Sequence, residues 1–167
     1  HEAVLGIDAL RHQLDLRQKK LDSKINYVCD RNFDLRRFKN EQIDLVFSQA
    51  AFEHFDDIPE TFSQLSEIVV PGGTLIAEID LSTHTRWIRD RDPLNIYRYP
   101  EFYYDFFKFR GTPNRLRPYQ YKALLEEYGW RDVRIIPSRI LGDDYIESVK
   151  NRLNRRFLSP ENHMEQL

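Results

Sequence analysis

The stretch IDLVFSQAAFEHFDD, residues 43–57, decides how the fold of this 167-residue chain is read. Its apolar start, Ile43–Phe47, has the composition of a buried strand. Polar side chains follow it at Ser48, Gln49, Glu53 and His54. Ligands of open α/β sheets bind just beyond the carboxyl ends of the strands, so these side chains are predicted to face a binding crevice.

Two strand candidates lie upstream of this stretch. Ala3–Ile7 ends at Asp8, and Ile25–Cys29 ends at Asp30. Residues 9–21, between them, carry leucines at helical spacing. A strand–helix–strand order predicts a parallel sheet with right-handed connections.

Downstream, a helix and another strand continue the alternation. Asp57 and Glu60 have the spacing of a capping box and predict a helix start. The Pro-Gly-Gly sequence at 71–73 is predicted to end this helix in a tight turn. Thr74–Ile79 is then predicted as a strand that ends at Asp80.

The last third of the chain contains three further predicted elements. Pro118 is predicted to open a helix that Gly129 closes. Arg131–Pro137 is predicted as a strand, and residues 143–156 as a polar amphipathic helix.

Residues 81–116 differ from the rest of the chain. They hold nine of the 22 aromatic residues, and Arg and Lys outnumber Asp and Glu. We expect a single domain over residues 1–167, with 81–116 as an insertion or lid over the sheet edge. The turn around Gly111 is a plausible hinge for it.

Composition excludes several classes of protein. Charged residues make up 31% of the chain and hydrophobic residues 41%, which is typical of a folded domain. The net charge of −2 argues against general nucleic-acid binding, and no apolar run is long enough to cross a membrane. A single cysteine, Cys29, excludes an internal disulfide framework and fits a cytoplasmic setting.

Five segments, in this order and spacing, carry a resemblance to a known family: Val4–Asp8, Tyr27–Asp30, Ile43–His54, Val70–Ile76 and Leu124–Trp130. Together they resemble the Rossmann-like (class I) S-adenosylmethionine-dependent methyltransferases, from their second strand onward. The resemblance implies an α/β fold with a three-layer, mostly parallel sheet. The family's first strand and glycine-rich loop would precede His1, so we expect a truncated domain, and its last strand is not evident either.

The resemblance also implies which residues meet S-adenosylmethionine. Asp8 would accept hydrogen bonds from the ribose hydroxyls. Asp30 and Arg31 would meet the adenine, and Ser48 and Gln49 the methionine end. Each has a structural alternative, such as a helix cap or a turn.

On the acceptor side, His54 is the predicted general base because an imidazole titrates near neutral pH. Glu53 is the second catalytic candidate. The predicted acceptor contacts are His84, Tyr99, Arg110 and Arg115. We predict no metal ion in this site. The acceptor is predicted to be a small polar molecule, with a saccharide favoured by the aromatic and arginine-rich segment.

Other interpretations stay open. His54 also fits a structural histidine at a helix start. The arginines fit surface ion pairs, and the aromatic residues fit core packing or a homodimer interface. A non-catalytic methyltransferase-like binding module is the alternative function. A nucleotide-dependent oxidoreductase is disfavoured by the Pro-Gly-Gly turn and by the acidic end of the third strand.

Overall fold

The structure is a computed structural model that describes residues 26–30 and 32–158. The chain forms two compact units, His1–Asp34 and Leu35–Leu167. The predicted strand at 3–7 and helix at 9–21 lie outside the described residues.

The described residues of the first unit form no helix or strand. The prediction of a strand at Ile25–Cys29 is therefore wrong for residues 26–29. A strand exists only through its ladder hydrogen bonds, and these residues make none, while the Tyr27 side chain is exposed. Asp30 instead closes a local turn, where its Oδ1 accepts from the Asn32 N–H at 2.8 Å.

The second unit is built on one strand–helix–strand motif. Strands β1 (Ile43–Gln49) and β2 (Val69–Glu78) pair in parallel, and helix α2 (Ile58–Ile68) connects them. This confirms the strand at 43–48 and the parallel pairing. In the described residues the sheet has two strands, so the larger three-layer sheet stays a prediction.

The Pro-Gly-Gly sequence is part of β2 and not a turn that separates helix from strand, so that prediction is wrong. Ile43 pairs with Val69, but Leu45 pairs with Thr74, so two steps along β1 match five along β2. The strand forms at once because the C-cap residue Val69 is already extended. The extra residues bulge, and the positive φ of Gly72, +84°, allows the bend.

Helix α2 begins where the sequence predicts. Asp57 Oδ1 accepts from the Glu60 N–H at 2.9 Å, which caps the helix. Its apolar side chains Ile58, Phe62 and Leu65 are buried. The cap and the apolar stripe are both local sequence signals, which is why the prediction is confirmed.

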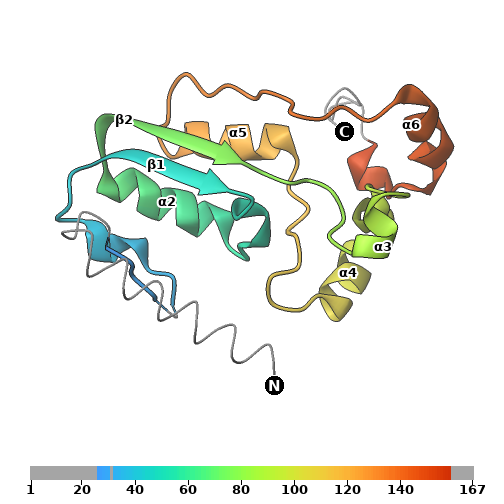
Figure 1. The fold of residues 1–167 in the computed structure, drawn as a ribbon, viewed down its shortest axis with the longest axis horizontal. Helices are drawn as coiled ribbons and strands as arrows, with labels where there is room; N and C mark the ends of the chain where they lie inside the picture. Colours follow the sequence, from blue (N-terminus) through green and yellow to red (C-terminus); the bar gives the residue numbers. More distant parts are fainter. Residues whose placement is uncertain (1–25, 31, 159–167) are drawn as a thin grey trace, which may run out of the picture. The chain divides into compact units, whose positions relative to one another are not determined.

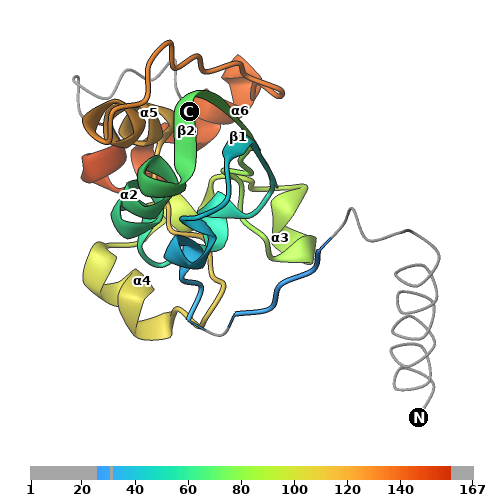
Figure 2. The same cartoon turned by 90° about the vertical axis from the view of Figure 1, so that its left-hand side faces the viewer.

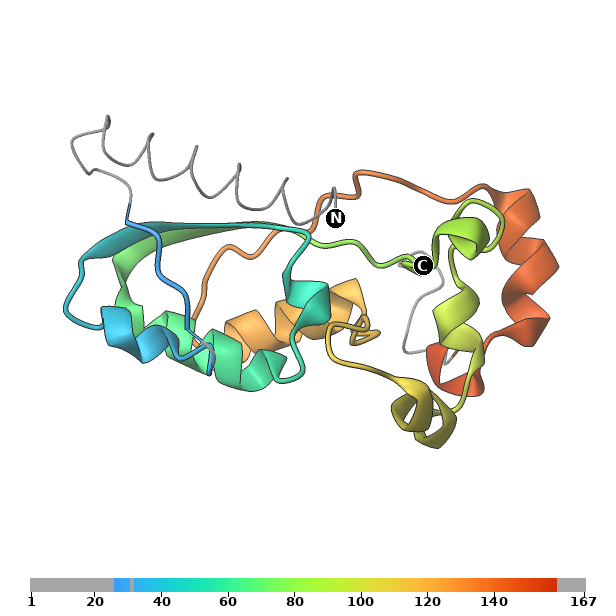
Figure 3. The same cartoon turned by 60° about the horizontal axis from the view of Figure 1, so that its bottom comes forward.

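Helix α5 (Pro118–Glu127) lies beside α2, and both helices are on the same side of the strand pair (Figures 2 and 3). Tyr121 of α5 packs with Phe62 and the other buried residues of α2 in the first hydrophobic cluster. Gly129, with φ +90°, follows the helix as predicted. Val46 of β1 and Leu75 of β2 pack against this cluster from the strands.

A second hydrophobic cluster joins residues 94–97 to the C-terminal helices. It includes Tyr97 and Phe157, whose ring centroids are 5.0 Å apart. The elements of this region, labelled in Figure 1 where there is room, are α3 (Arg86–Arg89), η3 (Asn95–Arg98), α4 (Glu101–Phe107), α6 (Asp143–Val149), η4 (Lys150–Arg152) and η5 (Arg155–Phe157). The predicted helix at 143–156 is thus a short helix followed by two 3₁₀ turns.

The predicted strand at Arg131–Pro137 is also wrong. Its residues pair with no described strand, and Ile135 and Ile136 are exposed. Asp132 has a φ of +55°, which interrupts an extended chain. The apolar run alone therefore does not make a strand.

Within residues 26–30 and 32–158, no helix has the length and apolar character needed to cross a membrane.

Candidate active site

One wall of the candidate site follows β1. Ala50 has a φ of +46°, an uncommon conformation for a residue with a side chain, and it turns the chain at the end of the strand. The 3₁₀ helix η2 (Phe52–His54) comes directly after this turn. It carries Glu53 and His54 at the carboxyl edge of the sheet.

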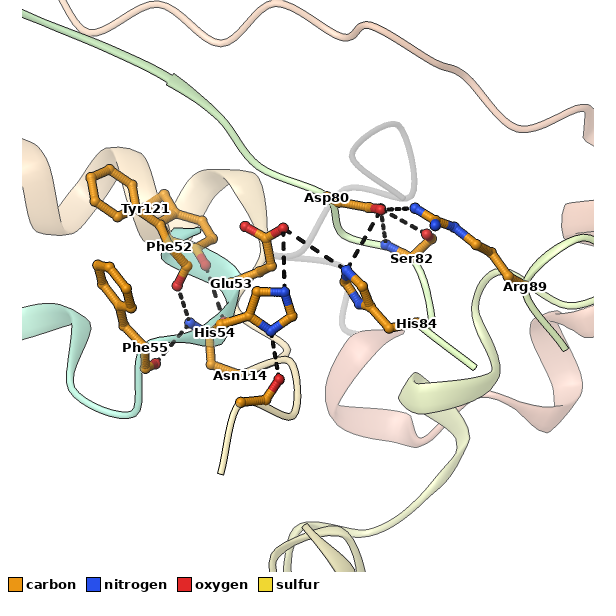
Figure 4. A network of polar contacts seen from close by, with 11 residues as sticks. Phe52, Glu53, His54, Phe55, Asp80, Ser82, His84, Arg89, Asn114 and Tyr121 are labelled. Carbon is orange, nitrogen blue, oxygen red and sulfur yellow. Dashed lines mark hydrogen bonds and ion pairs between the residues drawn. The ribbon is translucent and has the colours of Figure 1, made fainter. Parts of the chain in front are cut away.

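Asn114 fixes the shape of η2 (Figure 4). Its Nδ2 donates to the carbonyl oxygens of Phe52 at 2.9 Å and Phe55 at 3.2 Å. Its backbone N–H donates to the Glu53 carbonyl at 2.7 Å. Its Oδ1 accepts from the Tyr121 hydroxyl at 3.0 Å. The side chains of η2 are thus positioned by a residue about 60 positions away in the chain.

The other wall follows β2. Asp80 Oδ1 accepts from the Ser82 backbone N–H at 2.9 Å and the Ser82 hydroxyl at 2.7 Å. Its Oδ2 pairs with Arg89 and lies 3.7 Å from His84 Nε2. Burial alone would raise the pKa of Asp80, but the Ser82 hydrogen bonds and the Arg89 charge together hold it below its usual value. Asp80 is therefore a fixed, ionised carboxylate.

The two walls bring Glu53, His54 and His84 together; we call this set the Glu-His-His cluster. Glu53 Oε1 lies 4.0 Å from His54 Nε2 and 3.9 Å from His84 Nε2. The two imidazole rings are 4.7 Å apart between centroids. Figure 4 shows the three side chains pointing toward one another.

Burial governs the charges of this cluster. Glu53 is only 2% exposed, and neither of its carboxylate oxygens has a hydrogen-bond partner among the described residues. Burial lowers the pKa of His84, and together with the nearby His54 and Arg89 it outweighs the raising effect of Asp80 and Glu53. The neutral imidazole of His84 is therefore favoured near neutral pH. His54 Nδ1 lies 2.5 Å from the Gly111 carbonyl oxygen.

The residues predicted to meet the cofactor are only partly described. Asp8 and Arg31 lie outside the described residues. Ser48 is half-buried and Gln49 exposed at the end of β1, and Gln49 Nε2 donates to Glu78 Oε2 at 3.4 Å. A hydroxyl, an amide and a carboxylate at the ends of two paired strands suit the amino-acid end of S-adenosylmethionine, so these residues fit the cofactor.

The predicted acceptor residues have different surroundings. His84 belongs to the Glu-His-His cluster. Tyr99 is partly exposed and stacks on Tyr103 at 5.7 Å between ring centroids. Arg110 is exposed, next to the Gly111 carbonyl that contacts His54.

Arg115 is 2% exposed and contacts the protein itself. Its Nη1 donates to the carbonyls of Ile96 at 3.1 Å and Tyr99 at 2.8 Å. Its Nη2 pairs with Glu101 at 3.1 Å, and its guanidinium carbon lies 3.9 Å from the Tyr104 ring centroid. These contacts give Arg115 a role in holding residues 96–104 together.

Sequence reasoning missed two features of this site. It did not identify Asn114 as the residue that holds η2. It also treated His54 and His84 separately, although the structure groups Glu53, His54 and His84 with one potential metal ligand atom each, all within 4.8 Å of one another. The absence of a metal ion stays a prediction. A shared signal was present, because Glu53 lies four residues after Gln49 at the end of β1, and His84 lies four residues after Asp80, which follows β2.

A comparison with known families bears on these residues. Residues 1–77 match the sequence model of a family described as "Methyltransferase domain". No curated protein and no solved structure shows significant similarity to the chain. The match covers β1, α2 and most of β2, and it confirms the resemblance to methyltransferases. Residues 1–77 of this chain are therefore similar to methyltransferase domains.

Proposed function

We propose that the protein is an S-adenosylmethionine-dependent methyltransferase that acts on a small polar acceptor. The observation that carries this proposal is the match of residues 1–77 to the methyltransferase domain. The parallel motif inside that segment supports it, because its carboxyl edge carries polar and titratable side chains where α/β sheets bind ligands.

In this proposal, Ser48 and Gln49 hold the amino-acid end of the cofactor. Asp8 accepts from its ribose hydroxyls, and Asp30 and Arg31 meet its adenine. These roles follow from the family resemblance and from the chemistry of the side chains. The cofactor supplies an electrophilic methyl group, so the main task of the protein is to align the acceptor and exclude water.

His54 is the proposed base that accepts the acceptor's proton when the site holds no metal ion. A carbonyl oxygen can only accept, so the Nδ1–H of His54 donates to Gly111. The neutral ring then keeps its lone pair on Nε2. Glu53, 4.0 Å from Nε2, would stabilise the imidazolium that forms. Methyl transfer then forms the acceptor–carbon bond and breaks the sulfur–carbon bond, whose electron pair goes to sulfur.

Tyr99, Arg110 and His84 are the proposed acceptor contacts. An aromatic face packs against a sugar ring, and a guanidinium binds phosphate or carboxylate groups in two-point contacts. The saccharide class is proposed on this basis. A homodimer formed through the exposed aromatic side chains of α4 is a second proposal for that surface.

Calorimetric titration with S-adenosylmethionine tests the cofactor half. We expect binding by the full chain and weaker binding by Gln49→Ala, with Gln120→Ala on α5 as a control. Absence of binding would favour the alternative, a methyltransferase-like binding module without catalysis.

Mass spectrometry of sugars incubated with protein and cofactor tests the acceptor half. We expect one added methyl group on the acceptor, and loss of that product in His54→Gln with cofactor affinity unchanged. Full turnover in His54→Gln would reject the base assignment.

A further inference from the structure

We propose that the Glu-His-His cluster is a binding site for a divalent transition-metal ion. The binding itself does not depend on the proposed methyl transfer. Its consequence for acceptor activation does rest on that function. Four observations on Glu53, His54 and His84 support the site.

The first observation is the convergence of three donor atoms. Glu53 Oε1 is 4.0 Å from His54 Nε2 and 3.9 Å from His84 Nε2. Metal–ligand bonds of about 2.0–2.1 Å in a tetrahedral site place neighbouring donors about 3.3 Å apart. The two separations from Glu53 would therefore shorten by about 0.6–0.7 Å around an ion, which rotations of the imidazole rings and the carboxylate can provide.

The second observation is the hydrogen bond on the far side of His54. Its Nδ1 contacts the Gly111 carbonyl oxygen. A metal-binding histidine typically donates its other ring N–H to a carbonyl or carboxylate, which orients the ring and makes the ligating nitrogen more basic. His54 has this arrangement, with Nε2 directed at the other two donors (Figure 4).

The third observation is the state of Glu53. Its carboxylate is buried, and both oxygens lack a hydrogen-bond partner among the described residues. A buried carboxylate whose oxygens accept no hydrogen bond is unfavourable, because burial removes the water that would otherwise solvate it. A cation between Glu53 and the two histidines would satisfy this carboxylate.

The fourth observation concerns the groups around His84. Asp80 Oδ2 is 3.7 Å from its Nε2, and Arg89 pairs with Asp80 on the other side. Asp80 can supply a fourth oxygen ligand, because its carboxylate faces the same ring nitrogen that would bind the ion.

The donor set indicates the class of ion. Two imidazoles and one or two carboxylates suit Zn²⁺, Co²⁺ or Fe²⁺ better than Mg²⁺ or Ca²⁺, which prefer oxygen ligands. Metal binding and proton uptake use the same Nε2 lone pair of His54. With the ion bound, activation of the acceptor would pass from His54 to the ion acting as a Lewis acid.

Titration of the tag-free full chain with Co²⁺, followed by visible absorption, tests the site, with Zn²⁺ competition for affinity. We expect one ion per chain and ligand-field bands of a low-coordinate site. Glu53→Gln, His54→Gln and His84→Gln should each weaken binding about 10-fold to 100-fold or more, because each removes a donor. Glu60→Gln, an exposed glutamate on α2, is the matched control and should bind as the wild type does.

Unaltered stoichiometry and affinity in His84→Gln would overturn the proposal, as would the absence of Co²⁺ and Zn²⁺ binding by the folded wild type. His84 is part-exposed, so this variant keeps the test valid if Glu53→Gln fails to fold. Circular dichroism checks folding. Metal binding without methyl transfer would support the metal site and count against the proposed function. Methyl transfer without metal binding would support the proposed function and overturn the metal site.

Discussion

At the scale of single residues, Asn114 has the most consequences for the candidate site. One side chain satisfies two carbonyl oxygens around η2 and accepts from Tyr121 and from the Leu116 N–H. An aspartate there would lose the amide donors, and a leucine would lose every polar contact. The geometry of Glu53 and His54 therefore depends on an asparagine.

Asn114→Ala should lower the free energy of unfolding by about 2–4 kcal/mol, since each lost hydrogen bond contributes about 1 kcal/mol. Urea denaturation measures the change. Asn151→Ala, at an exposed position, is the control and should stay within about 0.5 kcal/mol of the wild type. Equal stabilities for the two variants would show that η2 does not depend on Asn114.

Tyr145 gives a pH-dependent prediction. Burial and its hydrogen bond to the Asp92 carboxylate raise the pKa of its hydroxyl to about 12, against about 10 in an unfolded chain. Between these values the unfolded chain has released the proton that the folded protein keeps, so stability falls as pH rises from 10 toward 12. Tyr145→Phe should flatten this fall in urea midpoints measured across that range. Tyr119 does not make this hydrogen bond, so Tyr119→Phe is the control. Its stability should fall with pH as steeply as that of the wild type.

At the scale of elements, success from sequence depended on local signals. Helices α2 and α5 were predicted because Asp57, Pro118 and Gly129 act on their own neighbours. The segments at 26–29 and 131–137 were wrongly predicted as strands, because a strand needs a partner that hydrophobicity does not identify. The bulge at 71–73 was predicted as a turn because glycine is common in bulges and in turns alike.

The cap of α2 can be tested directly. Asp57→Ala should lower the free energy of unfolding by about 1 kcal/mol, because the Glu60 N–H loses its acceptor. Thermal denaturation followed by circular dichroism measures this. Asp56→Ala removes a neighbouring exposed carboxylate that does not cap the helix, and it should have little effect. A larger loss from Asp56→Ala would contradict the assignment of the cap.

At the scale of the whole molecule, the second unit contains two hydrophobic clusters joined by polar contacts. The Tyr97 hydroxyl of the second cluster donates to the Leu81 carbonyl at 2.8 Å, and Leu81 packs against the first cluster. The Arg117 guanidinium carbon lies 4.7 Å from the Tyr97 ring centroid, just before α5. Residues 35–158 are therefore expected to unfold together.

Phe157→Ala tests this cooperativity from the second cluster. Loss of the buried Phe157 ring should lower the free energy of unfolding of the second unit by about 3–5 kcal/mol. In a Trp87→Phe background, Trp130 is the only tryptophan, and it packs on the first cluster. We expect Trp130 fluorescence and circular dichroism to report the same lowered urea midpoint. An unchanged Trp130 midpoint would mean that the two clusters unfold independently.

Single residues of the candidate site could be predicted from the sequence, but their meeting in space could not. Glu53 and His54 stood out because they follow β1, and Asp80 because it follows β2. Their meeting with His84 depends on the register of two strands about 30 residues apart, which no local signal encodes. The support from Asn114 depends on a still longer connection, so the sequence offered no sign of it.

The bulge in β2 determines which side of the sheet each later side chain of the strand faces. It inserts an odd number of residues, so the alternation of side chains from Thr74 onward is reversed relative to an unbroken strand. A side chain at Gly73 would force its neighbours to shift, because a Cβ would lie 2.4 Å from Val69 Cγ1 and 3.2 Å from the Asp44 carbonyl oxygen. Deleting one glycine would turn Leu75 away from the core and carry Asp80 and His84 to a new position. Two adjacent glycines thus position the site residues that follow β2 against those that follow β1.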